Sequence, residues 1–479
     1  MKKALVFLAL FLTLISFGFS TNYYISKIDG NDSYTGLAPA YVSGTNGPWL
    51  TLAKAVATIA SGSTVYLRAG TWNEQLYFPP NLPGYAATTT FKNHTGETPV
   101  IDMVSAGTGA AARGIYVDHC NYVRVEGITV RNSGNMAIRF ESSDNCSLVS
   151  CTTEHSRLSG IYFLYCDNFD VSYNSVKWSQ CTSGSHDHAQ WSGWSEECIS
   201  IGEESNYGDV HHNSISHGSE GDYGGEGLNI KNGCSYIYVH HNTVDQARDD
   251  SVESTRFCMG VDGWTTETHH IYFYNNIVKN GSWGIQFNSE EGGYTHHIYA
   301  WNNIVIHCGH SAWHGGGIGM PNFGSNPGKC DYCYFWNNTV FDCYYGARFV
   351  KTNIGAPIEV INNILDNCES SPIYFDGGVN QDLITRTNNL TDASDPHFLN
   401  EGAFDFHLTS ASTNCINQGT TVSGPSGYSP NVSVDYDGTG RPNGAAPDIG
   451  AYEYIINSLI RLGAGTKIRV ESGAKVVIK

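Results

Sequence analysis

The apolar and polar positions of this chain repeat as short alternating segments, without the period of a helix. The segment at 269–278, His-His-Ile-Tyr-Phe-Tyr-Asn-Asn-Ile-Val, returns nearly unchanged at 296–305, and related segments stand at 236–244, 331–340 and 358–365. Because side chains alternate between the two faces of a strand, each segment is predicted to be a strand. One unit cannot bury its apolar face alone, so the repeat predicts stacked coils.

A second recurring strand lies between these segments and begins with glycine. Its copies start at Gly114-Ile115, Gly160-Ile161, Gly227-Leu228, Gly284-Ile285 and Gly317-Ile318. Two short strands per period, no helical pattern between them and a spacing of roughly 23 to 38 residues are typical of a solenoid. The sequence therefore predicts an all-β protein, a parallel β-helix.

The amino terminus has the pattern of a secretory signal peptide over residues 1–20. Lys2 and Lys3 precede an apolar run from Ala4 to Phe17, and small residues follow up to Ser20. We expect cleavage near Ser20 and a monomeric protein that is secreted, extracellular or at the cell surface, or periplasmic. No later run is long and apolar enough to predict a transmembrane segment.

Residues 21–87 are predicted to form an N-terminal cap and the first coil. Thr51 can cap a short helix that runs to about Ile59 and covers the open end of that coil. The run from Tyr23 through Trp49 to Trp72 resembles the amino-terminal cap of secreted bacterial right-handed β-helix proteins of the pectate-lyase-like superfamily, many of which are polysaccharide lyases and hydrolases. The resemblance implies a right-handed solenoid, with repeats over 88–395.

Two later segments are predicted to lie outside the repeats. Residues 396–455 contain Asp435-Tyr436-Asp437-Gly438 and Pro447-Asp448-Ile449-Gly450, and they resemble the choice-of-anchor module found behind bacterial β-helices. Residues 456–479 alternate apolar and polar positions, which resembles a terminal β-segment of surface or secretion-sorted proteins.

Asparagine, cysteine and histidine recur at fixed places in the repeat. An asparagine follows each strand of the first kind, and these residues are predicted to form a structural ladder: Asn174, Asn213, Asn242, Asn276, Asn303, Asn338, Asn363 and Asn389. The histidine pairs are predicted to begin strands of successive coils and to form one stacked surface column: His211-His212, His240-His241, His269-His270 and His296-His297.

The cysteines fall into columns that predict free thiols. Cys308, Cys343 and Cys368 each stand five residues after a ladder asparagine. Equivalent positions of adjacent coils lie about 4.8 Å apart, which exceeds the roughly 3.8 Å Cβ separation that a disulfide prefers. The exception is the pair Cys181 and Cys198, which brackets a long loop and is the best disulfide candidate.

Three unusually long loops, at 179–197, 217–226 and 245–258, are predicted to build the wall of a groove along the solenoid. Aromatic side chains there are expected to stack on sugar rings. The predicted substrate-binding residues of this wall are Trp191, Trp194, Tyr223, Trp264 and Arg256. Asp249, Asp250 and Glu253 form an acidic cluster that could hold calcium through oxygen ligands, although a solvated turn explains it as well.

The strand at 226–231 is predicted to place candidate catalytic residues on the face of the solenoid that these loops flank. If Leu228 and Ile230 point inward, Asn229 and Lys231 point outward, and Asp262 of the next coil lies over Lys231. The same register continues the polar face with Ser200, Glu203, Gln286 and Asn288.

Two mechanisms and one structural alternative fit this face. In β-elimination, Lys231 would take a proton beside a uronate carboxylate. In hydrolysis, Asp262 would work with Glu203 or Glu226. In the structural alternative, Lys231 and Asp262 form only an exposed ion pair between coils.

The spacing from Glu226 to Lys231 resembles the Glu and Lys signature of β-helix lyases of alginate and dermatan. That resemblance implies that the Glu helps to hold calcium, and it departs at Asp262, where those lyases have an Arg.

The net charge of -19 argues against a nucleic-acid partner, since phosphate binding needs a basic surface. It also weighs against a polyanionic substrate unless basic residues or a bound cation offset it locally. The leading prediction is a secreted polysaccharide lyase that acts on a uronate-containing glycan. The alternatives are a glycoside hydrolase with paired carboxylates and a non-catalytic glycan-binding or adhesin solenoid.

Overall fold

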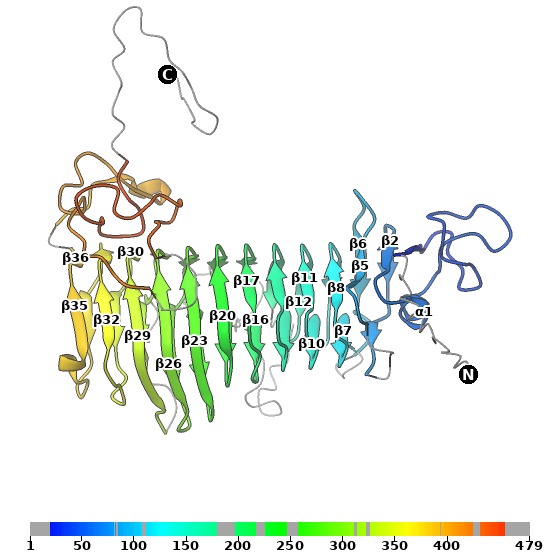
Figure 1. The fold of residues 1–479 in the computed structure, drawn as a ribbon, viewed down its shortest axis with the longest axis horizontal. Coiled ribbons are helices and arrows are strands. Elements are labelled where there is room, and N and C mark those ends of the chain that lie inside the picture. Colours follow the sequence, from blue (N-terminus) through cyan, green and yellow to red (C-terminus); the bar gives the residue numbers. More distant parts are fainter. Residues whose placement is uncertain are drawn as a thin grey trace, which may run out of the picture.

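The structure is a computed structural model that describes residues 20–80, 82, 85–107, 112–179, 197–216, 226–246, 257–310, 314–321, 326–392, 394–424 and 432–455. Its body is a long solenoid in which strands of successive coils lie side by side (Figure 1). The described strands of this body form three parallel sheets of 13, 12 and 11 strands. This architecture is the predicted right-handed parallel β-helix.

Each full coil contributes one strand to sheet 3, then one to sheet 1 and then one to sheet 2. Sheet 1 has the order β1 (Asn22–Ile25), β2 (Thr64–Leu67), β5 (Thr89–Asn93), β8 (Val123–Glu126), β11 (Ser147–Val149), β14 (Asp170–Ser172), β17 (Asp209–His211), β20 (Ser235–His240), β23 (Glu267–Tyr274), β26 (Tyr294–Trp301), β29 (Lys329–Trp336), β32 (Ile358–Ile361) and β35 (Ile384–Thr387).

Sheet 2 has the order β3 (Gly70–Trp72), β6 (Pro99–Asp102), β9 (Thr129–Arg131), β12 (Thr152–Ser156), β15 (Ser175–Ser179), β18 (Ser214–Ser216), β21 (Thr243–Asp245), β24 (Ile277–Lys279), β27 (Ile304–Ile306), β30 (Thr339–Phe341), β33 (Ile364–Asp366) and β36 (Leu390–Thr391). Sheet 3 has the order β4 (Leu76–Phe78), β7 (Ile115–Asp118), β10 (Ile138–Glu141), β13 (Ile161–Leu164), β16 (Glu197–Gly202), β19 (Glu226–Lys231), β22 (Phe257–Gly263), β25 (Trp283–Ser289), β28 (Gly316–Met320), β31 (Tyr345–Phe349) and β34 (Ser371–Phe375).

The inward side chains of the three sheets form one continuous hydrophobic core from Ile25 to Ile384. The recurring glycine of sheet 3 is explained by its close approach to sheet 2. A Cβ atom at Gly160 would lie 2.6 Å from Val176 Cγ1, and one at Gly227 would lie 2.5 Å from Val244 Cγ1. Even alanine does not fit without displacing the neighbouring strand, so the Gly-Ile pattern of the sequence records this contact.

A two-residue turn joins sheet 1 to sheet 2 in the coils that carry the ladder. Its first residue has a left-handed φ, 53° at Asn302, which asparagine tolerates. Its second residue is the ladder asparagine, and the Asn303 amide donates to the Phe273 carbonyl and to Asn338 Oδ1, both at 3.0 Å. Related bonds run along the stack from Asn174 to Asn389, which confirms the predicted ladder.

The predicted thiol column is also confirmed. The Cys308 N–H donates to Cys343 Sγ at 3.3 Å, and the sheet 2 register brings Cys368 beside Cys343 in the following coil. All three are free thiols. Cys181 lies outside the described residues, so its disulfide with Cys198 stays a prediction.

The N-terminal end of the solenoid is covered by α1 (Leu52–Thr58), as predicted. The Thr51 hydroxyl accepts the Lys54 N–H at 3.1 Å, and Leu52, Ala55 and Val56 are buried against the first coil. In the described part of the chain, no helix is both long enough and apolar enough to cross a membrane.

The C-terminal module, described at residues 396–424 and 432–455, packs beside the last coils (Figure 1, orange to red). It contains β37 (Phe398–Asn400), a 3-10 helix (Glu401–Ala403) and β38 (Asp405–Leu408), and it follows a 3-10 helix at Gln381–Leu383. Asparagines of the left-handed turns hold its backbone, since Asn302 Nδ2 donates to the Val434 carbonyl at 2.8 Å and Asn362 Nδ2 to the Thr420 carbonyl at 2.7 Å.

Candidate active site

The outward side chains of sheet 3 include one row along the solenoid axis, here called the central row. In register order it contains Tyr77, Tyr116, Arg139, Tyr162, Ser200, Asn229, Gly260, Gln286, Gly319, Arg348 and Tyr374. The predicted alignment of Ser200, Asn229 and Gln286 is therefore confirmed. At about 4.8 Å per coil, the row is about 48 Å long. Tyrosines stand at both ends, and polar side chains occupy the middle.

The middle of the central row holds polar groups that are buried without partners. Ser200 Oγ, Asn229 Oδ1 and both polar atoms of the Gln286 amide have no hydrogen bond within the described part of the chain. A buried polar atom without a partner destabilises a fold by about 1–3 kcal/mol, so native proteins rarely keep several together. This cluster of unsatisfied polar atoms makes the middle of the central row the candidate binding region.

Lys231 lies beside the central row and is in register with Asp262, as predicted. Its ammonium, however, forms its ion pair with the Glu197 carboxylate, which is 1% exposed. Burial lowers the pKa of Lys231, but the negative charges of Glu197 and Glu226 outweigh it and raise that pKa above its ordinary value. Proton abstraction by Lys231 would require a lowered pKa, so its ion pair with Glu197 does not favour the predicted role of Lys231 as the base.

Asp262 is a carboxyl group with a raised pKa. Burial and the neighbouring Glu290 carboxylate raise the pKa of Asp262 to about 7, against the opposing effects of Lys231 and of a hydrogen bond from Asn288. Asn288 Nδ2 donates to Asp262 Oδ1 at 3.0 Å and to Glu290 Oε1 at 2.8 Å. A carboxyl group with this pKa exchanges its proton near neutral pH, which suits acid and base catalysis.

A fully buried lysine, Lys351, orients the Asn288 side chain. Lys351 Nζ donates to the Ser289 carbonyl at 2.6 Å and contacts Asn288 Oδ1 at 3.4 Å. Because that oxygen faces the ammonium, the Asn288 amide nitrogen must face the two carboxylates. Burial lowers the pKa of Lys351. Lys351 follows β31 and stands outside the repeat, so no sequence pattern marked it.

The remaining described site residues surround this cluster. Glu226 Oε2 accepts from Asn229 Nδ2 at 3.0 Å, so the strand that carries Lys231 also carries a carboxylate beside the central row. Glu203 Oε2 accepts from Asn232 Nδ2 at 3.2 Å, and burial raises the pKa of Glu203. Trp264 Nε1 donates to Glu290 Oε2 at 3.3 Å, so the indole lies beside the Glu290 carboxylate.

Seven predicted residues lie outside the described part of the chain: Trp191, Trp194, Tyr223, Arg256, Asp249, Asp250 and Glu253. Sequence reasoning missed Glu197 and Glu290. Glu197 carried a usable signal, because Glu197-Cys-Ile-Ser-Ile has the same pattern as Glu226-Gly-Leu-Asn-Ile and the two glutamates are in register.

The paired histidines stack on one another, but they form two groups and not the predicted single column. His211 and His240 end their strands, with ring centroids 5.0 Å apart. His269 and His296 lie near the starts of β23 and β26, with ring centroids 5.2 Å apart. The prediction of one column is wrong because the first group precedes the turn to sheet 2, whereas the second follows the turn from sheet 3.

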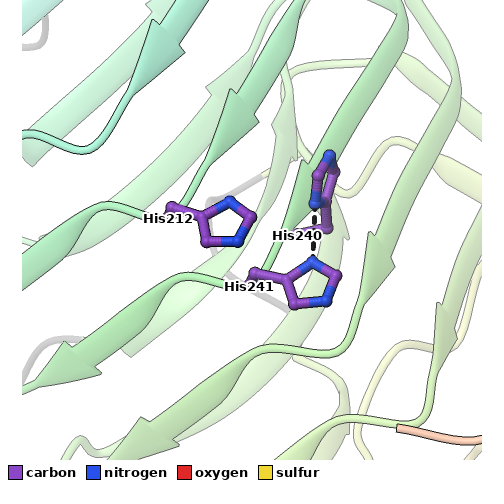
Figure 2. Close-up of side chains that lie close together, drawn as sticks. All are labelled: His212, His240 and His241. Carbon is purple, nitrogen blue, oxygen red and sulfur yellow. Dashed lines mark hydrogen bonds between the residues drawn. The ribbon is translucent and has the colours of Figure 1, made fainter. Parts of the chain in front are cut away.

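Figure 2 shows three histidines of the first group, His212, His240 and His241, which come from two adjacent coils. His240 Nδ1 lies 2.8 Å from His241 Nδ1, and its Nε2 lies 2.9 Å from an oxygen of Asp209. Burial, with the neighbouring histidines, lowers the pKa of His241 to about 4. A proton on one Nδ1 that is shared with the other Nδ1 explains the short contact between His240 and His241.

These three histidines offer nitrogens that lie within 4.8 Å of one another and could bind a metal ion. The rings of His212 and His241 are nearly parallel, with centroids 4.8 Å apart, so their matching nitrogens point the same way. Two zinc ligands lie at most about 4.2 Å apart, because each Zn–N bond is about 2.1 Å. The arrangement therefore fits hydrogen bonding better than a zinc site.

The fold and this face define a parallel β-helix with an elongated polar row that ends in aromatic rings. No family model matches the sequence, and no curated protein sequence matches it. Among solved structures, the chain is similar to XylC in complex with xylose (10% identity, TM-score 0.50, covering 90% of this chain and 98% of that chain). It is also similar to pectate lyase Pel9A (17%, 0.44, 91% and 97%) and to a lacto-N-biosidase from Eubacterium ramulus (12%, 0.41, 78% and 68%). At these identities the likeness shows the fold alone.

Proposed function

We propose that this protein is a secreted carbohydrate-active enzyme that hydrolyses a polysaccharide bound along the central row, with Asp262 as the proton donor. The observation that supports this best is Asp262 itself, whose pKa is raised to about 7 and which lies in the row beside the buried polar atoms of Asn229 and Gln286. A row about 48 Å long suits a linear polymer better than a single small ligand.

Hydrolysis needs a second carboxylate across the scissile bond, and Glu226 is our candidate. Glu226 is less buried than Glu197, and Glu197 already forms an ion pair with Lys231. In this mechanism Asp262 gives its proton to the leaving oxygen while Glu226 activates water or attacks the sugar carbon. Lys231 then holds Glu197 and limits the rise in the Asp262 pKa without taking a proton itself.

Elimination from a uronate is the second candidate. Its support is that Arg139 and Arg348 stand in the central row and could bind carboxylates of an acidic glycan. Both already bind acidic side chains, Glu141 at 2.8 Å and Asp376 at 3.0 Å, and Lys231 has the wrong pKa shift for the base. We therefore rank elimination below hydrolysis.

The test is incubation with a panel of neutral and acidic polysaccharides, read both as new reducing ends and as absorbance of unsaturated uronates. Reducing ends alone indicate a hydrolase and both signals a lyase, whereas binding without either indicates a non-catalytic glycan-binding protein. Repeating the assay with a chelator tests the predicted calcium.

Variants separate the mechanisms. Asp262→Asn and Glu226→Gln should each lower the rate by roughly 100-fold or more, because each removes one of the paired groups. Glu154→Gln is the matched control, since Glu154 lies on β12 of sheet 2 and carries the same change of charge. Full activity in Asp262→Asn would rule out the mechanism proposed here.

A further inference from the structure

Sheet 1 carries rows of aromatic rings on its outer face, away from the central row. In the first row, Tyr207, Tyr236, His270, His297 and Tyr332 stack at centroid distances of 5.1, 4.9, 4.9 and 4.5 Å. In the second row, Tyr238, Tyr272, Tyr299 and Tyr334 stack at 5.0, 5.4 and 4.6 Å. Within a row, each ring covers the face of the previous one, so these faces are not available to a ligand.

Both rows end on the same strand, β29, where a third ring, Trp336, stands beside them. In the next coil, Glu359 is in register with Tyr334, and Ile361 is in register with Trp336. Within the described part of the chain, Tyr334 and Trp336 are therefore followed in the next coil by Glu359 and Ile361 and not by another ring. A cavity of about 570 Å³ opens at this point, and its lining includes Tyr332, Tyr334, Trp336 and Glu359.

The far wall of the cavity belongs to the C-terminal module, at residues 421–424. Two hydrogen bonds fix this wall to the solenoid, from Asn362 Nδ2 to the Thr420 carbonyl at 2.7 Å and from the Thr420 N–H to Asn362 Oδ1 at 2.9 Å. Val422 packs against the aromatic cluster. The cavity thus has two anchored sides and a size typical of small-molecule sites.

The polar groups of the cavity favour a neutral ligand with several hydroxyls. Glu359 Oε2 accepts from Trp336 Nε1 at 2.9 Å, and no described residue donates to Oε1. Thr421 and Ser423 contribute hydroxyl groups, and no lysine or arginine is among the lining residues that the structure describes. Burial and the neighbouring His296 lower the pKa of His297, so that ring is neutral at pH 7. Glu359 is the charged residue among the described lining residues, and its negative charge disfavours anionic sugars.

We propose that this cavity is a second glycan-binding site that holds a neutral sugar residue, with Tyr334 as a stacking platform and Glu359 as an acceptor for sugar hydroxyls. Trp336, tilted by 51° from Tyr334 at a centroid distance of 4.9 Å, forms the adjacent side. This site lies on sheet 1, so it does not depend on the chemistry proposed for sheet 3. Aromatic rings beside an acid also attract a quaternary ammonium ion, so choline is the comparison ligand that separates this class from a neutral sugar.

The test is calorimetric titration with neutral oligosaccharides of glucose, xylose, mannose and galactose, with oligouronates and choline as comparison ligands. The experiment uses the full chain carrying Asp262→Asn, so that turnover does not consume the ligand. We expect one neutral oligosaccharide to bind, at least tenfold weaker binding in Tyr334→Ala, and several-fold weaker binding in Glu359→Gln. Tyr334→Phe, which keeps the ring, should bind nearly as well as the parent protein.

Tyr238→Ala is the matched control, because Tyr238 begins the row that Tyr334 ends and does not line the cavity. It should bind as the parent does, as should Glu154→Gln on sheet 2. The proposal is overturned if no neutral sugar binds, if oligouronates or choline bind more tightly, or if Gln286→Ala removes binding while Tyr334→Ala does not. That last outcome would place the sugar on sheet 3 and leave the proposed enzyme function standing.

Discussion

Replacing Asp262 by asparagine should change how stability depends on pH. The folded protein holds the pKa of Asp262 at about 7, against an ordinary value of 3.8, so folding resists ionisation of this group. For an acid with a raised pKa, stability is complete below the ordinary pKa and is lost as pH rises through the folded pKa. Wild-type protein should therefore lose stability between about pH 4 and pH 8.

The magnitude follows from the shift of about three pH units, which corresponds to about 4 kcal/mol at 1.36 kcal/mol per unit. Water reaches part of the Asp262 side chain, so screening reduces the expected effect to about 2–4 kcal/mol. In Asp262→Asn this component disappears, because an amide does not ionise. The Asn288 hydrogen bond is kept, since the new amide oxygen can accept from the same Nδ2 at about the same distance.

The assay is urea unfolding at pH 4.5, 6 and 8, with free energies extrapolated to zero denaturant. Relative to wild type, Asp262→Asn should be about 2–4 kcal/mol more stable at pH 8 and nearly equal at pH 4.5. Glu154→Gln serves as the control and should follow the wild-type pH dependence. Parallel curves for wild type and Asp262→Asn would refute the raised pKa, and with it the assignment of Asp262 as proton donor.

Three further predictions follow from named contacts. Glu290→Gln removes the charge that raises the Asp262 pKa, so the basic limb of the activity profile should move down by about one pH unit, and an unmoved profile would contradict this coupling. Asn303→Ala removes the side-chain hydrogen bonds to the buried Phe273 carbonyl and the Asn276 N–H, so it should lower the free energy of unfolding in urea by roughly 2–5 kcal/mol. Asn389→Ala, at the half-exposed end of the ladder, should lower that free energy much less. His241→Asn should fold normally, because Asn275 occupies the same turn position in the next coil. Folding opposes protonation of His241, so the melting temperature of wild type should fall between pH 7 and pH 4.5, and that of His241→Asn should fall less.

The repeat made the inward half of the fold predictable. Val, Ile and Leu alternate with outward residues, and the Gly-Ile pattern fixes the strands of sheet 3, so the register of Lys231 with Asp262 followed from the sequence. The ladder asparagines and thiol columns were predictable for the same reason, because equivalent positions in a parallel stack must meet.

The charge relations of the site were not predictable in the same way. Lys231 pairs with Glu197, which begins β16 directly after a long loop, and Lys351 reaches Asn288 from a turn beyond β31. Neither contact follows from strand register, because side-chain reach and turn geometry decide them. The prediction of a single histidine column was wrong for a related reason. The same His-His dipeptide occurs before the turn to sheet 2 in some coils and after the turn from sheet 3 in others, and the sequence alone did not distinguish the two positions.

Both proposed sites lie where a row of equivalent side chains is interrupted. In sheet 3 the interruption is Gly260, between Asn229 and Gln286, where a Cβ atom would lie 2.7 Å from Gln286 Cγ. In sheet 1 it is the change from Tyr334 to Glu359 in the next coil. An unbroken row satisfies its own members by stacking or by hydrogen bonding, as the asparagine ladder does. An interruption leaves a ring face or an amide without its neighbour, so a ligand can take the missing neighbour's place. In this solenoid, therefore, the repeat accounts for stability, and the positions where it stops account for the proposed binding.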